Sequence, residues 1–307
     1  MIYYHFKMKS SFKKLTQKRT FGAVCGILAA VCYGTNPLGA VKLYALGYTT
    51  GNVLLFRFTF AALILAVVIA ARRIVFYPHH RRDFFLVLAL GFLFAVSSIT
   101  FYESFRMMDV GAASTLIFAY PVLTAVIMCT FFRERFTRAT LAAIVLALSG
   151  ISCLTLGGGE HRVTLLGLGV IFLSALTYAV YIVIVNRVRA RLHVSTMTFW
   201  ILFFCALFVA LWAALTTGTK SFRLPTGPEA WFYAVFLGIT PTLLSLVFMT
   251  YSSRILGATP TAILGALEPL TAVSIGVFVF GETFTAKLAI GLALVVAAVL
   301  AVLLKRR

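Results

Sequence analysis

Long apolar runs separated by short charged segments form the main pattern of the chain. Eight runs contain no Asp, Glu, Lys or Arg: 20–41, 84–102, 110–132, 139–159, 163–186, 192–219, 230–253 and 288–304. Two more, 43–71 and 255–281, carry one charge each, Arg57 and Glu268. Because a membrane-spanning helix needs about 20 predominantly apolar residues, the pattern predicts ten transmembrane helices, numbered below in chain order.

The composition excludes an ordinary water-soluble domain. The 307 residues are 62% hydrophobic and 11% charged, with a mean hydropathy of +1.02, whereas soluble domains have about 45–50% apolar and about 25% charged residues. Ten spans use about 200 residues, which leaves short loops and no sizeable extramembrane domain. The fold class predicted is therefore an all-α integral membrane protein rather than a membrane-anchored soluble enzyme.

The strongly basic charge, +19, does not indicate a nucleic-acid partner, since the Lys and Arg residues punctuate apolar runs instead of clustering on one face. With a cytoplasmic N-terminus, 20 of the 27 Lys and Arg residues lie on that side and 6 on the other. The positive-inside rule then predicts that both termini are cytoplasmic. Residues 1–19 and 305–307 are predicted to be basic segments on anionic lipid. Residues 1–41 could also be a signal peptide, but their apolar run is too long.

Enzyme motifs are missing from the sequence. The cysteines lie in apolar runs without a C-x-x-C pair, and the histidines lie in loops or in the N-terminal lead, so we expect no metal, cofactor or disulfide. No H-E-x-x-H, P-loop or G-x-S-x-G occurs. A channel or a structural scaffold is an alternative, although no filter motif favours a channel. Without an ATP-binding motif, transport would use a gradient or run downhill.

The chain repeats itself. Tyr120-Pro121 in helix 4 is followed after two residues by Thr-Ala, and Glu268-Pro269 in helix 9 is followed after one residue by Thr-Ala. Thirteen residues after each proline comes a glutamate, Glu134 or Glu282. We expect these two glutamates to orient the following turns rather than to bind substrate.

A second correspondence lies in helices 1 and 6, where Gly22 precedes Tyr33 and Gly167 precedes Tyr178 by eleven residues. The chain thus divides into two five-helix repeats, 20–156 and 164–304. Because five is odd, the second repeat begins on the opposite side of the membrane and runs inverted. Inverted repeats are typical of secondary transporters, whose substrate site lies near the midplane between the repeats.

Further motifs are Leu55-Phe56-Arg57-Phe58 in helix 2 and the pairs Arg133-Glu134 and Gly281-Glu282. With the repeated motifs above, they resemble the EamA-type branch of the drug/metabolite transporter superfamily. The resemblance implies an exporter of amino acids or similar small metabolites in the cytoplasmic (inner) membrane of a bacterium. It also implies that helices 1, 3, 4, 6, 8 and 9 line a central cavity, with helices 5 and 10 outside.

Polar side chains concentrate in the helices expected around that cavity, where lipid offers them no partners. We predict that eleven of them bind substrate or line the cavity: Tyr33, Asn36, Ser98, Tyr102, Tyr120, Thr124, Tyr178, Tyr181, Thr242, Ser245 and Glu268. Each hydroxyl could instead join two helices. An aromatic and hydroxyl lining favours neutral or aromatic amino acids, or amphipathic amines as in a multidrug exporter; no oligomeric state is favoured.

Glu268 is the acid nearest the middle of a predicted span, where an unpaired carboxylate is costly. It could bind a substrate amine or carry a coupling proton. The structural alternative is that it bonds to backbone or hydroxyl groups near Pro269.

Four prolines stand within spans: Pro37, Pro121, Pro241 and Pro269. Each removes a backbone hydrogen bond, so each is either a hinge or a static kink. Arg57 and Glu103 both belong to the outer half of the membrane, and we predict an ion pair between them that forms an outer gate or a structural clamp.

Overall fold

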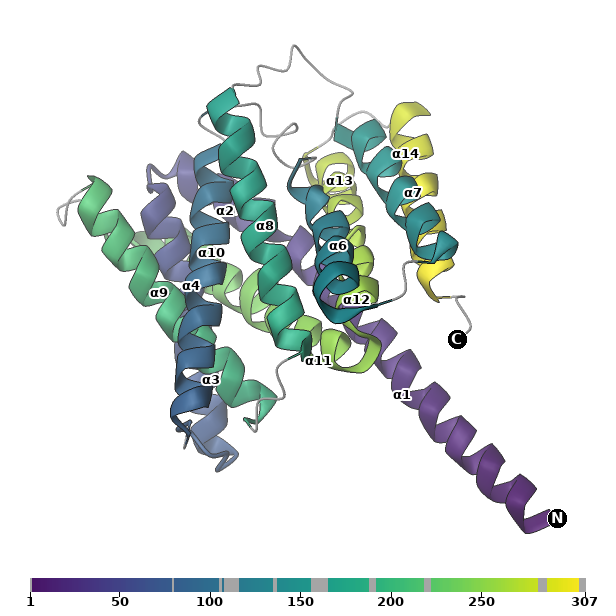
Figure 1. The fold of residues 1–307 in the computed structure, drawn as a ribbon. Coiled ribbons are helices and arrows are strands. Elements are labelled where there is room, and N and C mark those ends of the chain that lie inside the picture. Colours follow the sequence, from purple (N-terminus) through teal and green to yellow (C-terminus); the bar gives the residue numbers. More distant parts are fainter. Residues whose placement is uncertain are drawn as a thin grey trace.

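The computed structural model is a bundle of helices (Figure 1). It describes residues 2–78, 80–104, 107, 116–134, 137–155, 165–187, 192–217, 222–280 and 286–303, and these residues contain no β-strand. Six helices among them are long and apolar enough to cross a membrane, and three shorter apolar helices accompany them. The predicted all-α membrane fold is confirmed.

The first repeat folds into five helical units. Helix 1 is interrupted and helix 4 begins with a 3₁₀ turn, whereas the other three are continuous. In order the segments are α1 (Ile2–Gly34) with α2 (Asn36–Ala45), α3 (Thr50–Ala71), α4 (Arg81–Ser104), η1 (Ile117–Ala119) with α6 (Tyr120–Phe132), and α7 (Arg138–Thr155).

The second repeat also contains five helical units, and because this number is odd it runs inverted relative to the first. Helix 8 contains a π-helical segment and helix 9 is broken. In order the segments are α8 (Leu165–Arg187), α9 (Val194–Thr217), α10 (Gly227–Leu237) with η3 (Gly238–Leu244) and α11 (Ser245–Leu256), α12 (Ala258–Leu264) with α13 (Leu267–Phe280), and α14 (Ala286–Leu303).

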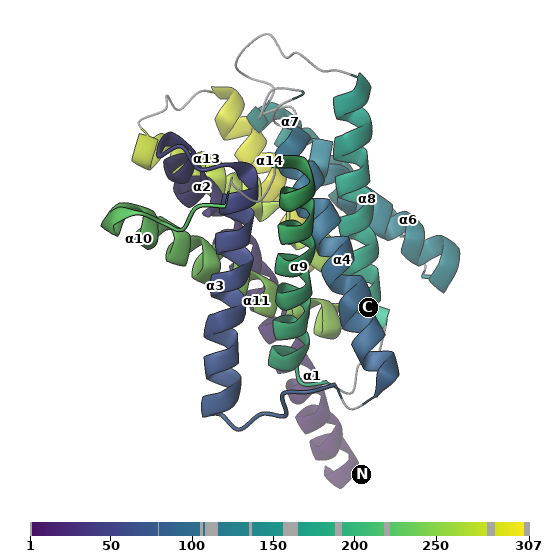
Figure 2. The same cartoon turned by 90° about the vertical axis from the view of Figure 1, so that its left-hand side faces the viewer.

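The packing follows a pseudo-twofold relation between the repeats. Two helices pack on their own counterparts, α3 on α9 and α7 on α14. The contact of α1 with α11 has its counterpart in that of α8 with α4. The pair α7 and α14 lies at one edge of the bundle (Figure 1), and α3, α4 and α9 run side by side in the turned view (Figure 2).

Each of the four candidate hinge prolines stands where regular α-helical geometry is interrupted. Pro37 follows the break at Thr35, whose hydroxyl donates to the Cys32 carbonyl at 2.7 Å. Pro121 is the second residue of α6, Pro241 lies inside η3, and Pro269 is the third residue of α13. A proline cannot donate the usual backbone hydrogen bond, which accounts for the interruptions, and movement at them stays a prediction.

We predict that Gly91→Ala in α4 lowers the thermal stability of the detergent-purified protein. The added methyl carbon would lie 2.6 Å from Cβ of Phe204 and 3.0 Å from the Ile201 carbonyl oxygen in α9, so the two helices must separate. Overpacking of this kind costs about 1–3 kcal/mol. Gly169→Ala in α8 is the matched control, because among the described residues no atom beyond the backbone of its own helix lies within 4 Å of the added carbon. Equal melting temperatures for the two variants would contradict the packing of α4 on α9.

Candidate functional site

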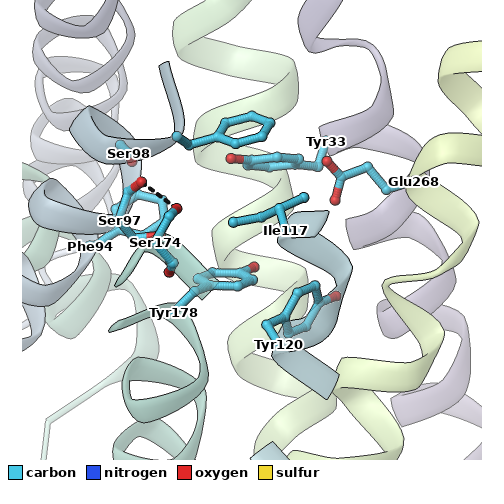
Figure 3. Close-up of a pocket in the computed structure, with 10 residues that line it drawn as sticks. Tyr33, Phe94, Ser97, Ser98, Ile117, Tyr120, Ser174, Tyr178 and Glu268 are labelled. Carbon is cyan, nitrogen blue, oxygen red and sulfur yellow. Dashed lines mark hydrogen bonds between the residues drawn. The ribbon is translucent and has the colours of Figure 1, made fainter. Parts of the chain in front are cut away.

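A small cavity lies where the two repeats meet (Figure 3). Its volume is about 30 Å³, and a water molecule needs roughly 10–15 Å³ on this measure. The cavity therefore accommodates about two water molecules, and an amino acid can enter only if the helices move. Helices 1, 3, 4, 6 and 9 contribute its walls: Tyr33, Phe94, Ser97, Ser98, Phe101, Ile117, Tyr120, Ser174, Tyr178 and Glu268.

Four of the lining residues are the two pairs that correspond between the repeats. Tyr33 and Tyr178 are counterparts in helices 1 and 6, and Tyr120 and Glu268 are counterparts in helices 4 and 9. Figure 3 shows the Glu268 carboxylate beside Tyr33, and Tyr178 next to Tyr120. The Tyr120 and Tyr178 rings meet edge to face at a centroid distance of 4.9 Å. The cavity thus lies on the pseudo-symmetry axis, at the place where the sequence repeat is most evident.

The break in helix 9 places Glu268 at the cavity. In a regular α-helix the Ala266 amide would donate to the Ala262 carbonyl. Here it donates to the Ile263 carbonyl at 3.0 Å, which leaves the Ala262 carbonyl available. Pro269 has no N–H for the Gly265 carbonyl, and the Glu268 amide donates to that carbonyl at 2.9 Å. The Tyr120 hydroxyl, from the other repeat, donates to the Ala262 carbonyl at 3.0 Å. A backbone carbonyl freed inside a membrane therefore has an internal partner, as the apolar surroundings require.

Two glycines permit the close approach of helices at this break. A Cβ on Gly265 would overlap the Tyr120 hydroxyl, so a larger residue would displace that hydroxyl from the Ala262 carbonyl. A Cβ on Gly34, the last residue of α1, would lie 2.6 Å from the Glu268 carbonyl oxygen. Glycine at both positions lets α1 and α6 reach helix 9, which brings Tyr33 and Tyr120 to Glu268.

Serines join helices 3 and 6 beside the cavity. Ser174 Oγ donates to the Ser97 carbonyl at 2.7 Å, and Ser97 Oγ donates to the Ser174 carbonyl at 3.1 Å. These hydroxyls connect helices, which is one of the two roles expected for such groups.

Tyr181 stacks on the lining residue Tyr178, with ring centroids 6.1 Å apart and planes 5° apart. Tyr181 therefore packs against a lining residue and is not itself among the residues that line the cavity.

Arg57 forms a second polar cluster, fully buried beside the cavity. Its Nη1 donates to the Tyr102 hydroxyl at 2.9 Å, and its Nε donates to Thr242 Oγ1 at 3.1 Å. Asn36 donates to the same Tyr102 hydroxyl at 2.9 Å. The guanidinium lies 5.5 Å from the ring centroid of Tyr33, which also lines the cavity. Arg57 thus belongs to the immediate surroundings of the site, although helix 2 was not expected there.

The π-helical segment of helix 8 explains how Thr242 reaches Arg57. Thr242 follows Pro241, and its hydroxyl donates to the Leu237 carbonyl at 2.6 Å while accepting from Arg57. Such bulges are frequent at functional sites. Helix 8 therefore contributes to the polar cluster rather than to the cavity wall.

The other predicted residues take different positions. Thr124 donates to the Tyr120 carbonyl of its own helix at 2.7 Å, and Ser245 is buried near the start of α11. Glu103 is half-buried next to Tyr102, whereas the hydrogen bonds of Arg57 lead to Tyr102 and Thr242, so the Arg57–Glu103 pair stays a prediction. Glu134 accepts from Thr259 at 3.5 Å, and Glu282 is outside the described residues.

Five of the lining residues were not predicted from the sequence: Phe94, Ser97, Phe101, Ile117 and Ser174. The two serines differ in no sequence feature from hydroxyls elsewhere in the same helices. The three apolar residues are indistinguishable by sequence from lipid-facing ones. Within the described residues, no group of three or more His, Cys, Asp or Glu could hold a metal ion.

The fold and the cavity define a class: a multi-pass membrane protein built from two inverted repeats around a central polar site. The sequence matches the EamA-like transporter family over residues 20–156 and 165–304. The chain belongs to this family and is a membrane transporter of that kind.

Relatives agree with this assignment. A protein of Archaeoglobus fulgidus named an uncharacterized transporter is 29% identical over 91% of this chain and 95% of its own length. A probable terminal-alkyne amino-acid exporter of Streptantibioticus cattleyicolor is 27% identical over 82% of this chain and 83% of its own length. An uncharacterized transporter of Synechocystis, 27% identical, is matched over 63% of its length.

A solved crystal structure shares the fold. Its TM-score with this chain is 0.75 at 21% sequence identity, over 91% of this chain and 95% of the other. At that identity the likeness concerns the fold alone.

We predict that Gly265→Ala and Tyr120→Phe destabilise the protein through the same contact. Either change separates the Tyr120 hydroxyl from the Ala262 carbonyl, and an unsatisfied buried polar group costs about 1–3 kcal/mol. The double variant should therefore unfold at nearly the same temperature as the less stable single variant, in a thermal melt of detergent-purified protein. Additive losses would show that the two residues act independently.

Proposed function

We propose that the protein is a secondary exporter of small organic metabolites, with amino acids or closely related compounds as substrates. The proposal rests on the position of Glu268, the carboxylate of a cavity that also contains three tyrosines and lies at the junction of the two inverted repeats. A carboxylate among hydroxyls and aromatic rings suits a ligand that bears an ammonium group. The printed name of the Streptantibioticus relative, an amino-acid exporter, supports the same class.

The second candidate is an exporter of amphipathic amines. The same carboxylate and rings would hold such a cation, and five of the ten lining side chains are aromatic: Tyr33, Phe94, Phe101, Tyr120 and Tyr178. An amine differs from an amino acid in lacking a carboxylate, so charge selectivity separates the two candidates.

The mechanism proposed is alternating access around the cavity. The interrupted helices 1, 4, 8 and 9 are the elements that rearrange, and their prolines Pro37, Pro121, Pro241 and Pro269 mark the hinges. Opening one end of the interface between the repeats admits the substrate, and opening the other releases it. The distribution of Lys and Arg supports cytoplasmic termini in an inner membrane, with export running from that side.

Glu268 is the group that we propose couples transport to protons. It alternately holds a proton and the ammonium group of the substrate, so that arrival of a proton favours release of the cargo. Both cannot occupy one carboxylate at once, and this competition links the two fluxes. Neighbouring titratable side chains are Tyr33, Tyr120 and Tyr178 on the cavity wall, and Arg57, whose guanidinium lies 5.5 Å from the Tyr33 ring centroid.

We predict that Glu268→Gln abolishes the response of transport to a pH gradient. Proteoliposomes of purified protein would be tested for uptake of labelled neutral and aromatic amino acids, with and without an imposed gradient. The wild type should take up an amino acid saturably, and the gradient should stimulate its uptake. In Glu268→Gln the stimulation should disappear, and the remaining uptake should fall about tenfold or more because the ammonium loses its charged partner.

Glu229→Gln is the matched control for this experiment. Glu229 is an exposed carboxylate in the first turn of α10, away from the cavity, and its replacement should leave both uptake and the gradient response unchanged. A Glu268→Gln protein that retains wild-type uptake and a wild-type gradient response would contradict the coupling role of Glu268.

A further inference from the structure

Two oppositely charged side chains lie close to one cavity residue, Tyr33. Tyr33 lies next to the Glu268 carboxylate (Figure 3), and its ring centroid is 5.5 Å from the Arg57 guanidinium carbon. The cluster thus combines one cation and one anion around a single tyrosine.

Arg57 is the permanent charge of this cluster. Its side chain is completely buried, and a guanidinium does not lose its proton in proteins. Three aromatic rings surround it, those of Tyr33, Phe58 and Tyr102, at centroid distances of 5.5, 5.5 and 5.9 Å. Rings and hydroxyls solvate the cation without neutralising it, so a carboxylate is needed to balance it.

One donor of Arg57 is unused. Nε and Nη1 donate to Thr242 and Tyr102, whereas the buried Nη2 makes no hydrogen bond within the part of the chain that the structure describes. A buried donor without a partner is costly. An incoming carboxylate would satisfy it, and carboxylates are the preferred partners of a guanidinium.

Glu103, in the last turn of α4, is not among the residues that line the cavity. Glu268 is therefore the carboxylate of the cavity itself.

We propose that Arg57 and Glu268 together make the site electrically neutral and thereby select substrates that are zwitterions. Glu268 binds the ammonium group of the substrate, and Arg57 binds its carboxylate through Nη2 once Tyr33 moves aside. A ligand with only one of the two groups leaves either Arg57 or Glu268 uncompensated in an apolar environment, at a large cost. The inference rests on the proposed transport function and narrows it from amines and amino acids to amino acids.

The test uses three probes that share a phenyl ring and differ in charge: L-phenylalanine, 2-phenylethylamine and 3-phenylpropionate. Labelled uptake into proteoliposomes would be measured for each, alongside the thermal shift that each produces in detergent-purified protein. The wild type should favour L-phenylalanine by about tenfold or more over both analogues, since a site built for a polar group rejects a ligand that lacks it.

Variants should shift this order in opposite directions. Glu268→Gln leaves Arg57 in excess and should raise the preference for 3-phenylpropionate over 2-phenylethylamine about tenfold. Arg57→Gln should shift the ratio the other way, and the double variant should return it towards the wild-type value. Arg57→Lys keeps the positive charge and should keep the wild-type order of preference among the three probes. It serves as the control in case the protein does not fold with an uncharged residue at this position. Glu229→Gln should change nothing.

The outcomes separate the two levels of the proposal. If the wild type takes up L-phenylalanine but Glu268→Gln leaves the ratio of acid to amine unchanged, the charge-balance inference is wrong and transport stands. If the wild type prefers 2-phenylethylamine, the site is an amine site and the inference is wrong. If the wild type neither binds nor takes up any probe, nor L-leucine, the proposed amino-acid transport itself is contradicted.

Discussion

The Tyr120 hydroxyl, 3.0 Å from the Ala262 carbonyl oxygen, connects the two repeats at the break in helix 9. Inside a membrane, a helix can be interrupted only where the freed backbone groups find partners in the protein. The tyrosine supplies that partner, and Gly265 leaves the room for it. The broken helix in turn places Glu268 on the cavity wall. One cross-repeat hydrogen bond thus allows the backbone geometry on which the site depends.

The same physical constraint explains what sequence alone could predict. Charge-free runs mark the spans because charges are costly in lipid, so ten helices and their inverted repetition follow from counting. Tyr120 and Glu268 could be paired because each precedes a proline at corresponding places, and Tyr33 and Tyr178 because each follows a glycine by eleven residues. All four line the cavity. Local sequence patterns identify these residues because the repeats place equivalent positions around one pseudo-twofold axis.

Features that depend on packing were not predictable in this way. Residue counting placed Arg57 in the outer half of the membrane. It could not show that Arg57 bonds to Tyr102 of α4 or to Thr242, which lies in a π-helical segment of the other repeat. Phe94 and Ile117 line the cavity, yet nothing in their local sequence separates them from lipid-facing residues. Thr124 bonds to its own helix instead. Periodicity shows that a helix has a polar side but not which neighbouring helix faces it.

A cavity of about 30 Å³ is consistent with a transporter only if it opens to each side in turn. The most direct test places a cysteine at Ser98, a lining residue, in a chain whose five native cysteines are replaced. Its reaction with a membrane-impermeant thiol reagent would be followed from each face of oriented vesicles. Alternating access predicts labelling from both faces, with an amino-acid substrate slowing the reaction from each. Labelling from one face only, unaffected by any amino acid, would contradict transport through this cavity.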